Sequence, residues 1–150
     1  MIDLKKELYQ KCLAYVQNRL EAAKQALDDV QAAVNDETKS SAGDKYETSR
    51  EMMQQETDRN LAQLNEANKL KVALSTITTG GSAATAEPGS VVITDNGSFY
   101  LAISAGIITV NNEKYYAVSP MSPIGMKLKG LKSGNKFTLN DKSYLIEQVI

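Results

Sequence analysis

The sequence contains no His, no Trp and a single Cys, Cys12. These absences exclude Ser-His-Asp and Cys-His catalysis, zinc sites built from His or paired Cys, and a disulfide within the chain. A lone Cys is typical of a reducing compartment. No apolar run approaches the roughly 20 residues that a membrane helix requires, and residues 1–7 lack the apolar core of a secretory signal. We therefore expect a cytoplasmic protein with no membrane partner.

A surplus of charge is also missing. The net charge is -1, from 17 basic and 18 acidic residues, and both halves of the chain are close to neutral. A protein that binds duplex DNA directly normally carries clustered Lys and Arg, because these side chains release counterions from the phosphates. We therefore expect no direct sequence-specific DNA binding.

Pro and Gly are scarce in one half of the chain only. Residues 1–74 have no Pro and a single Gly, Gly43, whereas the rest of the chain holds all three Pro and the other eight Gly. Between these halves lies a small, polar stretch at 75–88, which is typical of a linker. The composition predicts a helical region at 1–74, a linker at 75–88 and a second domain at 89–150.

Apolar or small residues recur at helical spacing through the first half, and the spacing from Leu20 onward is that of a coiled-coil seam. The first seam is Leu4, Leu8, Cys12, Val16, Leu20, Ala23, Leu27, Val30 and Val34. After a polar interruption at 35–43, a second seam follows at Tyr46, Met53, Asn60, Leu64, Ala67 and Leu74. Two such helices joined by a short turn predict an antiparallel coiled-coil hairpin, with Cys12 as a small buried residue.

The second domain reads as short strands separated by turn residues. The expected strands are 90–94, 99–103, 107–110, 115–118, 136–139 and 143–149, with a short helix near 124–129. Turn signals stand at 95–97, 111–112 and 140–141. The predicted fold class is α+β: an N-terminal hairpin of helices followed by a small, mainly antiparallel β domain with one short helix.

Residues 119–135, which we call the signature segment, closely resemble the C-terminal signature of the Gre-type transcription elongation factors of bacteria. The matching residues are Ser122, Pro123, Ile124, Gly125, Leu128, Gly130 and Gly134, and Asn135 stands where the family usually has Asp. Residues 46–51 resemble, more loosely, the start of the second hairpin helix of that family.

This resemblance implies an FKBP-like C-terminal domain that docks on RNA polymerase, while the coiled coil enters the secondary channel. Such a factor modulates or stimulates cleavage of backtracked transcripts. It acts on the polymerase, as a monomer, and is not an enzyme by itself. The residues expected to bind polymerase are Ser122, Pro123, Ile124, Gly125, Lys127 and Lys129. No cofactor is expected, because the Mg²⁺ that acidic tip residues help to hold belongs to the polymerase active site.

The sequence at the tip of the predicted hairpin differs from that of the cleavage-stimulating members of the family. Alignment on Tyr46 places Lys39 and Ala42 where those members carry their two tip acids. The candidate tip acids here are Asp44, Glu37 and Asp36. Asp44 also has the spacing of a capping box with Glu47. A metal-directed role and a helix cap are both open for Asp44, and a non-cleaving inhibitor or modulator of the polymerase is the alternative function.

Two alternatives belong to other functional classes. The first is an FKBP-like prolyl isomerase, although Phe99 and Phe137 are the only Phe and there is no Trp to line a substrate pocket. The second is an adaptor that dimerises through its coiled coil, which the polar Asn60 and Lys71 on the second seam disfavour. The Lys residues of the signature segment form either a solvated face or a docking surface for an acidic partner.

Overall fold

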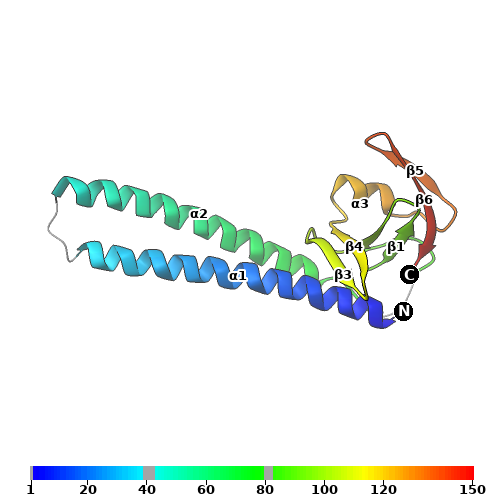
Figure 1. Cartoon of the computed structure of the whole chain (residues 1–150), viewed down its shortest axis with the longest axis horizontal. Coiled ribbons are helices and arrows are strands. Elements are labelled where there is room, and N and C mark those ends of the chain that lie inside the picture. Colours follow the sequence, from blue (N-terminus) through cyan, green and yellow to red (C-terminus); the bar gives the residue numbers. More distant parts are fainter. Residues whose placement is uncertain (1, 39–42, 80–82) are drawn as a thin grey trace. The chain divides into compact units, whose positions relative to one another are not determined.

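The computed structural model describes residues 2–38, 43–79 and 83–150, and within these ranges the side chains of all residues except 2, 37, 38 and 43–48. Two long helices come first, α1 (Ile2–Thr38) and α2 (Gly43–Ser75). A six-stranded sheet with one short helix follows in the sequence; Figure 1 shows the helices and the sheet domain. The predicted α+β class is thus confirmed. In the part of the chain that the structure describes, no helix is long and apolar enough to cross a membrane.

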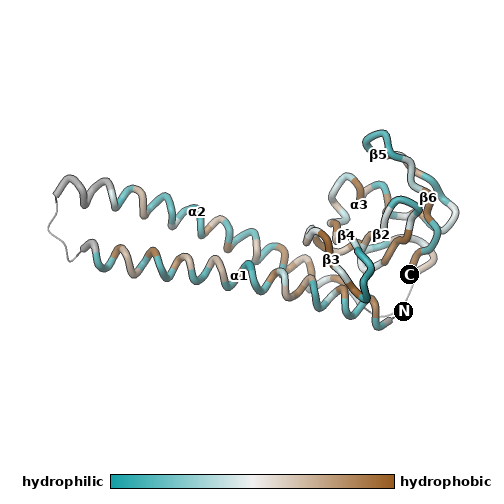
Figure 2. The backbone as a smooth tube through the Cα atoms, in the orientation of Figure 1, coloured by the Kyte–Doolittle hydropathy of each residue, from teal (hydrophilic) through white to brown (hydrophobic). Residues whose placement is uncertain are grey.

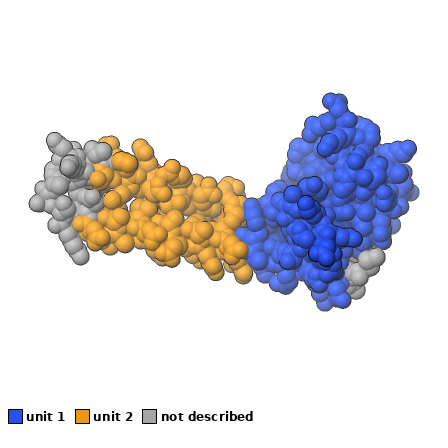
Figure 3. All heavy atoms as spheres, viewed as in Figure 1, with its two compact units in different colours: residues 1–15, 72–150 blue, residues 16–71 orange. Residues whose placement is uncertain are grey.

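The chain divides into two compact units (Figure 3). Unit 1 consists of Met1–Tyr15 and Val72–Ile150, and unit 2 is Val16–Lys71. The start of α1 and the end of α2 therefore belong to the same unit as the sheet. Within the stretch expected to be a linker, Ile77 and Ala86 are buried. The N–H of Ala86 donates to the carbonyl of Leu131 at 2.7 Å, which ties this stretch to the sheet domain.

In unit 2 the two helices pair through their apolar stripes. Val16, Leu20, Ala23 and Ala67, all on the predicted seams, are buried. Arg19 donates a hydrogen bond across the pair to Gln63. Figure 2 shows polar residues interspersed with apolar ones along both helices, as expected for helices that bury one stripe each.

The sheet has the strand order β3-β4-β2-β1-β6-β5. Its strands are β1 (Val91–Thr94), β2 (Gly97–Leu101), β3 (Gly106–Val110), β4 (Glu113–Val118), β5 (Lys136–Leu139) and β6 (Lys142–Val149). The pairings are antiparallel except for that of β2 with β4, which is parallel, so the sheet is mixed. Each strand overlaps a segment that the sequence predicts. The parallel pair has no signature in a single run of residues, because it joins strands separated by β3.

Two hairpin turns adopt the left-handed backbone that Asn and Asp tolerate. Asn111 and Asn112 have φ of 52° and 66°, and Asn140 and Asp141 have φ of 51° and 66°. Positive φ at both central residues defines the type I′ turn, whose twist matches that of the flanking strands. The turns predicted at 111–112 and 140–141 are confirmed.

The two faces of the sheet are buried in different ways. On one face, Ala86, Val92, Phe99, Leu128 and Ile146 form a core cluster beneath α3 (Pro123–Leu128). The neighbouring strand residues Val91 and Tyr100 point to the opposite face, because side chains alternate along a strand. Tyr100 interacts there with Cys12 and Tyr9 of α1, so the start of α1 covers this face.

Candidate functional site

The signature segment builds α3 through a capped first turn. Ser122 is the N-cap residue, and its Oγ accepts a hydrogen bond from the N–H of Gly125 at 3.1 Å. The same hydroxyl donates to the carbonyl of Ser119 at 2.6 Å. Pro123 follows at the first helical position, where its fixed φ suits the helix and its missing N–H costs nothing. The Ser-Pro pair of the signature segment thus has a local structural role at the start of α3.

Gly125 and Ile124 point inward from α3. Gly125 is buried against the backbone of Ser119, leaving no room for a side chain. Ile124 is half-buried and packs against the core cluster that contains Phe99 and Leu128. These two signature residues hold α3 on the sheet.

The outer side of α3 presents positive charge and Met side chains. Pro123, Lys127 and Lys129 are exposed. Met126 is 60% exposed, and Met121, just before the helix, is 76% exposed. From Lys114 to Asn140 the sequence has no Asp or Glu. A flexible thioether side chain adapts to apolar partners, and the Lys groups favour acidic ones. We call Met121, Pro123, Met126, Lys127 and Lys129 the α3 surface.

Of the six residues expected to bind polymerase, the structure brings all six to α3 and its cap but exposes only three of them. Pro123, Lys127 and Lys129 can reach a partner, whereas Ser122, Ile124 and Gly125 build the helix that presents them. The sequence-based reasoning missed the two Met residues of the α3 surface. Ile124 and Leu128, four residues apart on α3, pack into the core and leave Met126 on the outer side, which the sequence does not reveal before that packing is known.

The candidate tip acids lie on the long helices. Asp36 is exposed in α1, whose helix continues through Thr38. Asp44 lies one residue inside α2, which begins at Gly43, and Glu37 belongs to α1; the side chains of both are outside the described residues, as are Lys39 and Ala42. Among the described side chains, no group of three or more Cys, Asp or Glu could hold a metal ion.

Four aromatic rings lie along the α3 side of the sheet. Phe99 is 5.7 Å from Tyr116 and 6.0 Å from Tyr144, and Tyr144 stacks on Phe137 at 4.8 Å, all between ring centroids. Sequence reasoning considered only the two Phe residues. The rings of Phe99, Phe137 and Tyr144 pack on one another and belong to the core cluster or pack against it.

Three ionisable groups of unit 1 are buried: Cys12, Tyr100 and Lys5. Burial raises the pKa of the Cys12 thiol to about 12. Burial also raises the pKa of Tyr100, with smaller contributions from Cys12 and Tyr9. Lys5 is 5% exposed, and its burial lowers the pKa of its ammonium group while the charge of Glu87 opposes that change. Burial thus shifts the pKa of each group in the direction that favours its neutral form.

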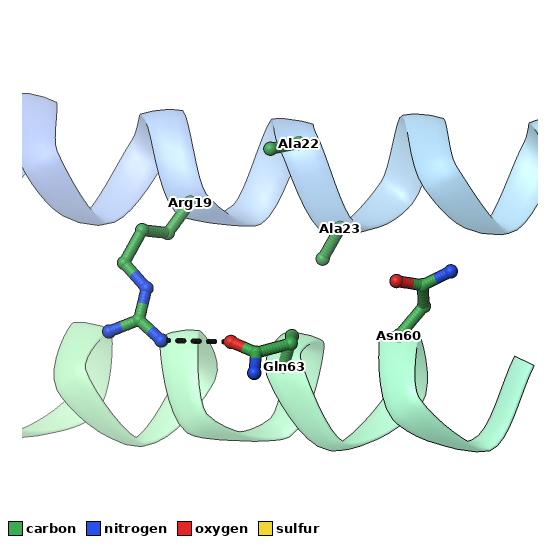
Figure 4. A pocket seen from close by; sticks show the side chains of 5 residues that line it. All are labelled: Arg19, Ala22, Ala23, Asn60 and Gln63. Atoms are coloured by element: carbon green, nitrogen blue, oxygen red, sulfur yellow. Dashed lines mark hydrogen bonds between the residues drawn. The ribbon is translucent and has the colours of Figure 1, made fainter. Parts of the chain in front are cut away.

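A hollow of about 210 Å³ opens between the helices of unit 2, at Arg19, Ala22, Ala23, Asn60 and Gln63 (Figure 4). On the α1 side it is lined by the short side chains of Ala22 and Ala23, and on the α2 side by Asn60 and Gln63. The guanidinium of Arg19 donates to Oε1 of Gln63 at 3.2 Å and closes one end. The Nδ2 atom of Asn60 is buried and has no hydrogen-bond partner among the described residues.

Comparison with known proteins brought no match: no protein-family model, no curated protein and no solved structure is significantly similar to this chain. The groups exposed at α3 are ammonium, thioether and pyrrolidine groups.

Proposed function

We propose that this protein is a Gre-like transcription factor that binds RNA polymerase. The FKBP-like sheet domain docks on the polymerase, and the coiled-coil hairpin of α1 and α2 enters the secondary channel to modulate the handling of backtracked transcripts. One observation carries the proposal: the residues that resemble the Gre signature form the single short helix of a sheet domain that follows two long helices of 37 and 33 residues. The chain acts on the polymerase as a monomer and has no catalytic activity alone.

The α3 surface is the docking site in this proposal. Its Lys groups attract an acidic region of the polymerase, and the exposed Met side chains supply apolar contact that adapts to the partner. The absence of Asp and Glu from residues 114–140 supports this, because no nearby acid in the sequence offsets Lys127 and Lys129. Reversing these two charges weakens binding without changing the fold, since both side chains are exposed.

Asp44 is the tip acid that we assign to metal chemistry, with Glu37 and Asp36 as neighbours. A carboxylate brought to the polymerase active site can contribute an oxygen ligand to a second Mg²⁺, which activates the attacking water. The metal belongs to the polymerase. A factor of this kind that lacks a correctly placed acid occupies the channel and inhibits or modulates the enzyme, which is the alternative outcome.

The test is the length of RNA in a backtracked elongation complex of the source organism's polymerase, with and without the full chain. Shortened RNA that is lost with Asp44→Ala on α2 and retained with Asp28→Ala, which changes an exposed acid on α1, establishes a cleavage factor. Unshortened RNA with the protein still bound establishes the non-cleaving modulator. No binding at all overturns the proposal.

Docking is tested separately by co-sedimentation with the polymerase. The charge-reversed variant Lys127→Glu/Lys129→Glu loses binding, whereas Lys24→Glu, an exposed Lys on α1, binds as the wild type does. Equal binding of all three proteins removes the α3 surface from the proposal.

A further inference from the structure

The two edges of the sheet differ in how they are protected. At one edge, β5 begins with Lys136, and its hairpin turn leads to Lys142 on β6. At the other edge, β3 carries no Lys, no Pro and no acid, and the sequence has no charged residue anywhere from Asn96 to Asn112. Charged residues, Pro and bulges are the usual devices that keep an edge strand from pairing with another chain. β3 has none of them.

Apolar side chains are exposed at the same edge. Ile107 of β3 is 58% exposed, and its cross-strand neighbour Tyr116 on β4 is 41% exposed. Tyr116 is held in place by Phe99, whose ring centroid is 5.7 Å away. The edge is therefore bordered by a fixed apolar surface made of Ile107 and Tyr116.

β3 is held in place by its buried side chains and by its pairing with β4. Ile108 and Val110 are buried, which fixes β3 in its register against β4. In the sheet formed by the described residues, β4 is the one strand that pairs with β3. An edge strand held rigidly in this way presents its outward N–H and C=O groups in a fixed row. Because β3 is already ordered, little conformational entropy is lost on its side when another strand pairs with it.

We propose that β3 pairs, antiparallel, with β3 of a second copy of this chain. The pairing is isologous, so the same strand supplies both sides of the contact. A pairing centred on Ile108 brings Ile107 of one copy opposite Thr109 of the other, and both are exposed. The contact covers Ile107 and extends each sheet by the strands of its partner.

The absence of charge on β3 permits an identical strand as the partner. β3 is neutral, so two copies meet without like-charge repulsion, and a charged strand would gain nothing there. The nearest charge on the exposed face is Lys114 of β4, which pairs with Thr109. In the dimer the two Lys114 residues are separated by three strand spacings, about 14 Å. That distance exceeds the Debye length of about 8 Å at physiological ionic strength, so their repulsion is screened.

This inference goes beyond the proposed function and does not depend on it. The interface is one short strand and an apolar border, which places it among small, weak interfaces. The dimer is consequently the form of the protein at high concentration only.

The experiment is sedimentation velocity of the full chain from micromolar to near-millimolar concentration. The wild type shows a sedimentation coefficient that rises with concentration. Ile107→Lys, which places a gatekeeper charge at the edge, loses this rise entirely. The matched control is Val72→Lys at the end of α2, where the wild-type side chain is 66% exposed, and it keeps the rise. A wild type that stays monomeric throughout, or a rise that Val72→Lys abolishes and Ile107→Lys does not, overturns the proposal.

Hydrogen exchange gives a second measurement that does not depend on a variant. Amides within Gly106–Val110 become more protected in concentrated than in dilute protein, whereas those of β5, Lys136–Leu139, do not change. Concentration-dependent protection confined to the long helices would assign the dimer to α1 and α2 and overturn pairing through β3. Thr109→Lys, also at an exposed position of β3, provides a replacement should Ile107→Lys fail to fold.

Discussion

A Cβ atom placed on Gly125 would lie 1.9 Å from the carbonyl oxygen of Ser119. No pair of atoms without a covalent bond tolerates that distance, and both groups belong to the backbone, so neither can rotate away. The close approach lets the first turn of α3 sit on the loop that precedes it. Gly125 is thus required for packing, in a conformation that other residues could adopt.

Gly125→Ala therefore destabilises unit 1, by about 3 kcal/mol, because the helix must move away from Ser119 and from the core beneath it. Gly134→Ala is the control: its φ of +92° strains a side chain, but no atom lies within 4 Å of the added Cβ. The expected cost there is about 1 kcal/mol. Urea unfolding followed by Tyr fluorescence measures both variants. Equal costs would show that the loop before α3 relaxes and that the close approach is not needed.

Ser122→Ala removes both hydrogen bonds of the N-cap hydroxyl, the one accepted from Gly125 and the one donated to Ser119. We expect a loss of about 1.5 kcal/mol in the free energy of unfolding. Ser122→Thr keeps a hydroxyl at the same position and should recover most of the loss. The readout is again the urea midpoint. If Thr and Ala are equally destabilising, the methyl group of Thr clashes or the hydroxyl has no stabilising role.

These two predictions bear on what the motif means. The sequence alone assigned Ser122 and Gly125 to polymerase binding, because they match a family signature. The contacts give both residues a local task in building α3. The motif residues Ser122 and Gly125 can thus serve binding indirectly, by shaping the helix that presents the α3 surface. In that case a variant such as Gly125→Ala weakens docking through loss of structure, whereas Lys127→Glu/Lys129→Glu weakens it with the structure intact.

The fold class was readable from the sequence because each element has a strong local pattern. The seam residues from Leu8 to Ala23 were expected to be buried, and they are. The Asn111-Asn112 pair predicted a turn whose two central residues adopt the left-handed backbone conformation, which Asn tolerates well. The strand order was not readable. The parallel pairing of β2 with β4 depends on contacts between residues distant in sequence, such as Phe99 with Tyr116.

The α3 surface was readable in part, for a related reason. Charge is visible in a sequence, so Lys127 and Lys129 were found. Exposure is not visible, and Met121 and Met126 look like core residues until the packing of Ile124 and Leu128 is known. The exposed Ile107 was missed in the same way, because its neighbour Ile108 is buried and the two are indistinguishable by composition.

Tyr100 and Tyr115 form a matched pair of buried phenols. The hydroxyl of Tyr100 has no hydrogen-bond partner among the described residues, whereas that of Tyr115 donates to Glu113 at 3.2 Å. Tyr100→Phe should raise the free energy of unfolding by about 1 kcal/mol, since it removes a polar group buried without a partner. Tyr115→Phe should lower it by about 1 kcal/mol. Opposite signs in the same urea assay are the expected result. A loss of stability in Tyr100→Phe would show that its hydroxyl is stabilised in the folded protein.

Cys12 reports on the contact between α1 and the sheet. Burial raises the pKa of its thiol to about 12, against about 8.5 for a free Cys. At pH 8 the folded molecules therefore carry the neutral thiol almost entirely, whereas about a quarter of the unfolded chains carry a thiolate. Because the thiolate is the reactive form, labelling by a disulfide reagent at pH 8 should require release of α1 from the sheet.

The pH dependence follows from the same shift. The folded pKa lies above the unfolded one, so the contribution of Cys12 to stability is complete below about pH 8.5 and is lost as the pH rises toward 12. Tyr100, whose pKa is raised chiefly by burial, adds to this alkaline loss. Labelling at pH 8 should therefore be slow in the native protein and fast in urea, and Tyr100→Phe should slow it further by stabilising the same contact. Fast labelling of the native protein would mean that the start of α1 leaves the sheet readily, and residues 1–15 would then not belong to the stable part of unit 1.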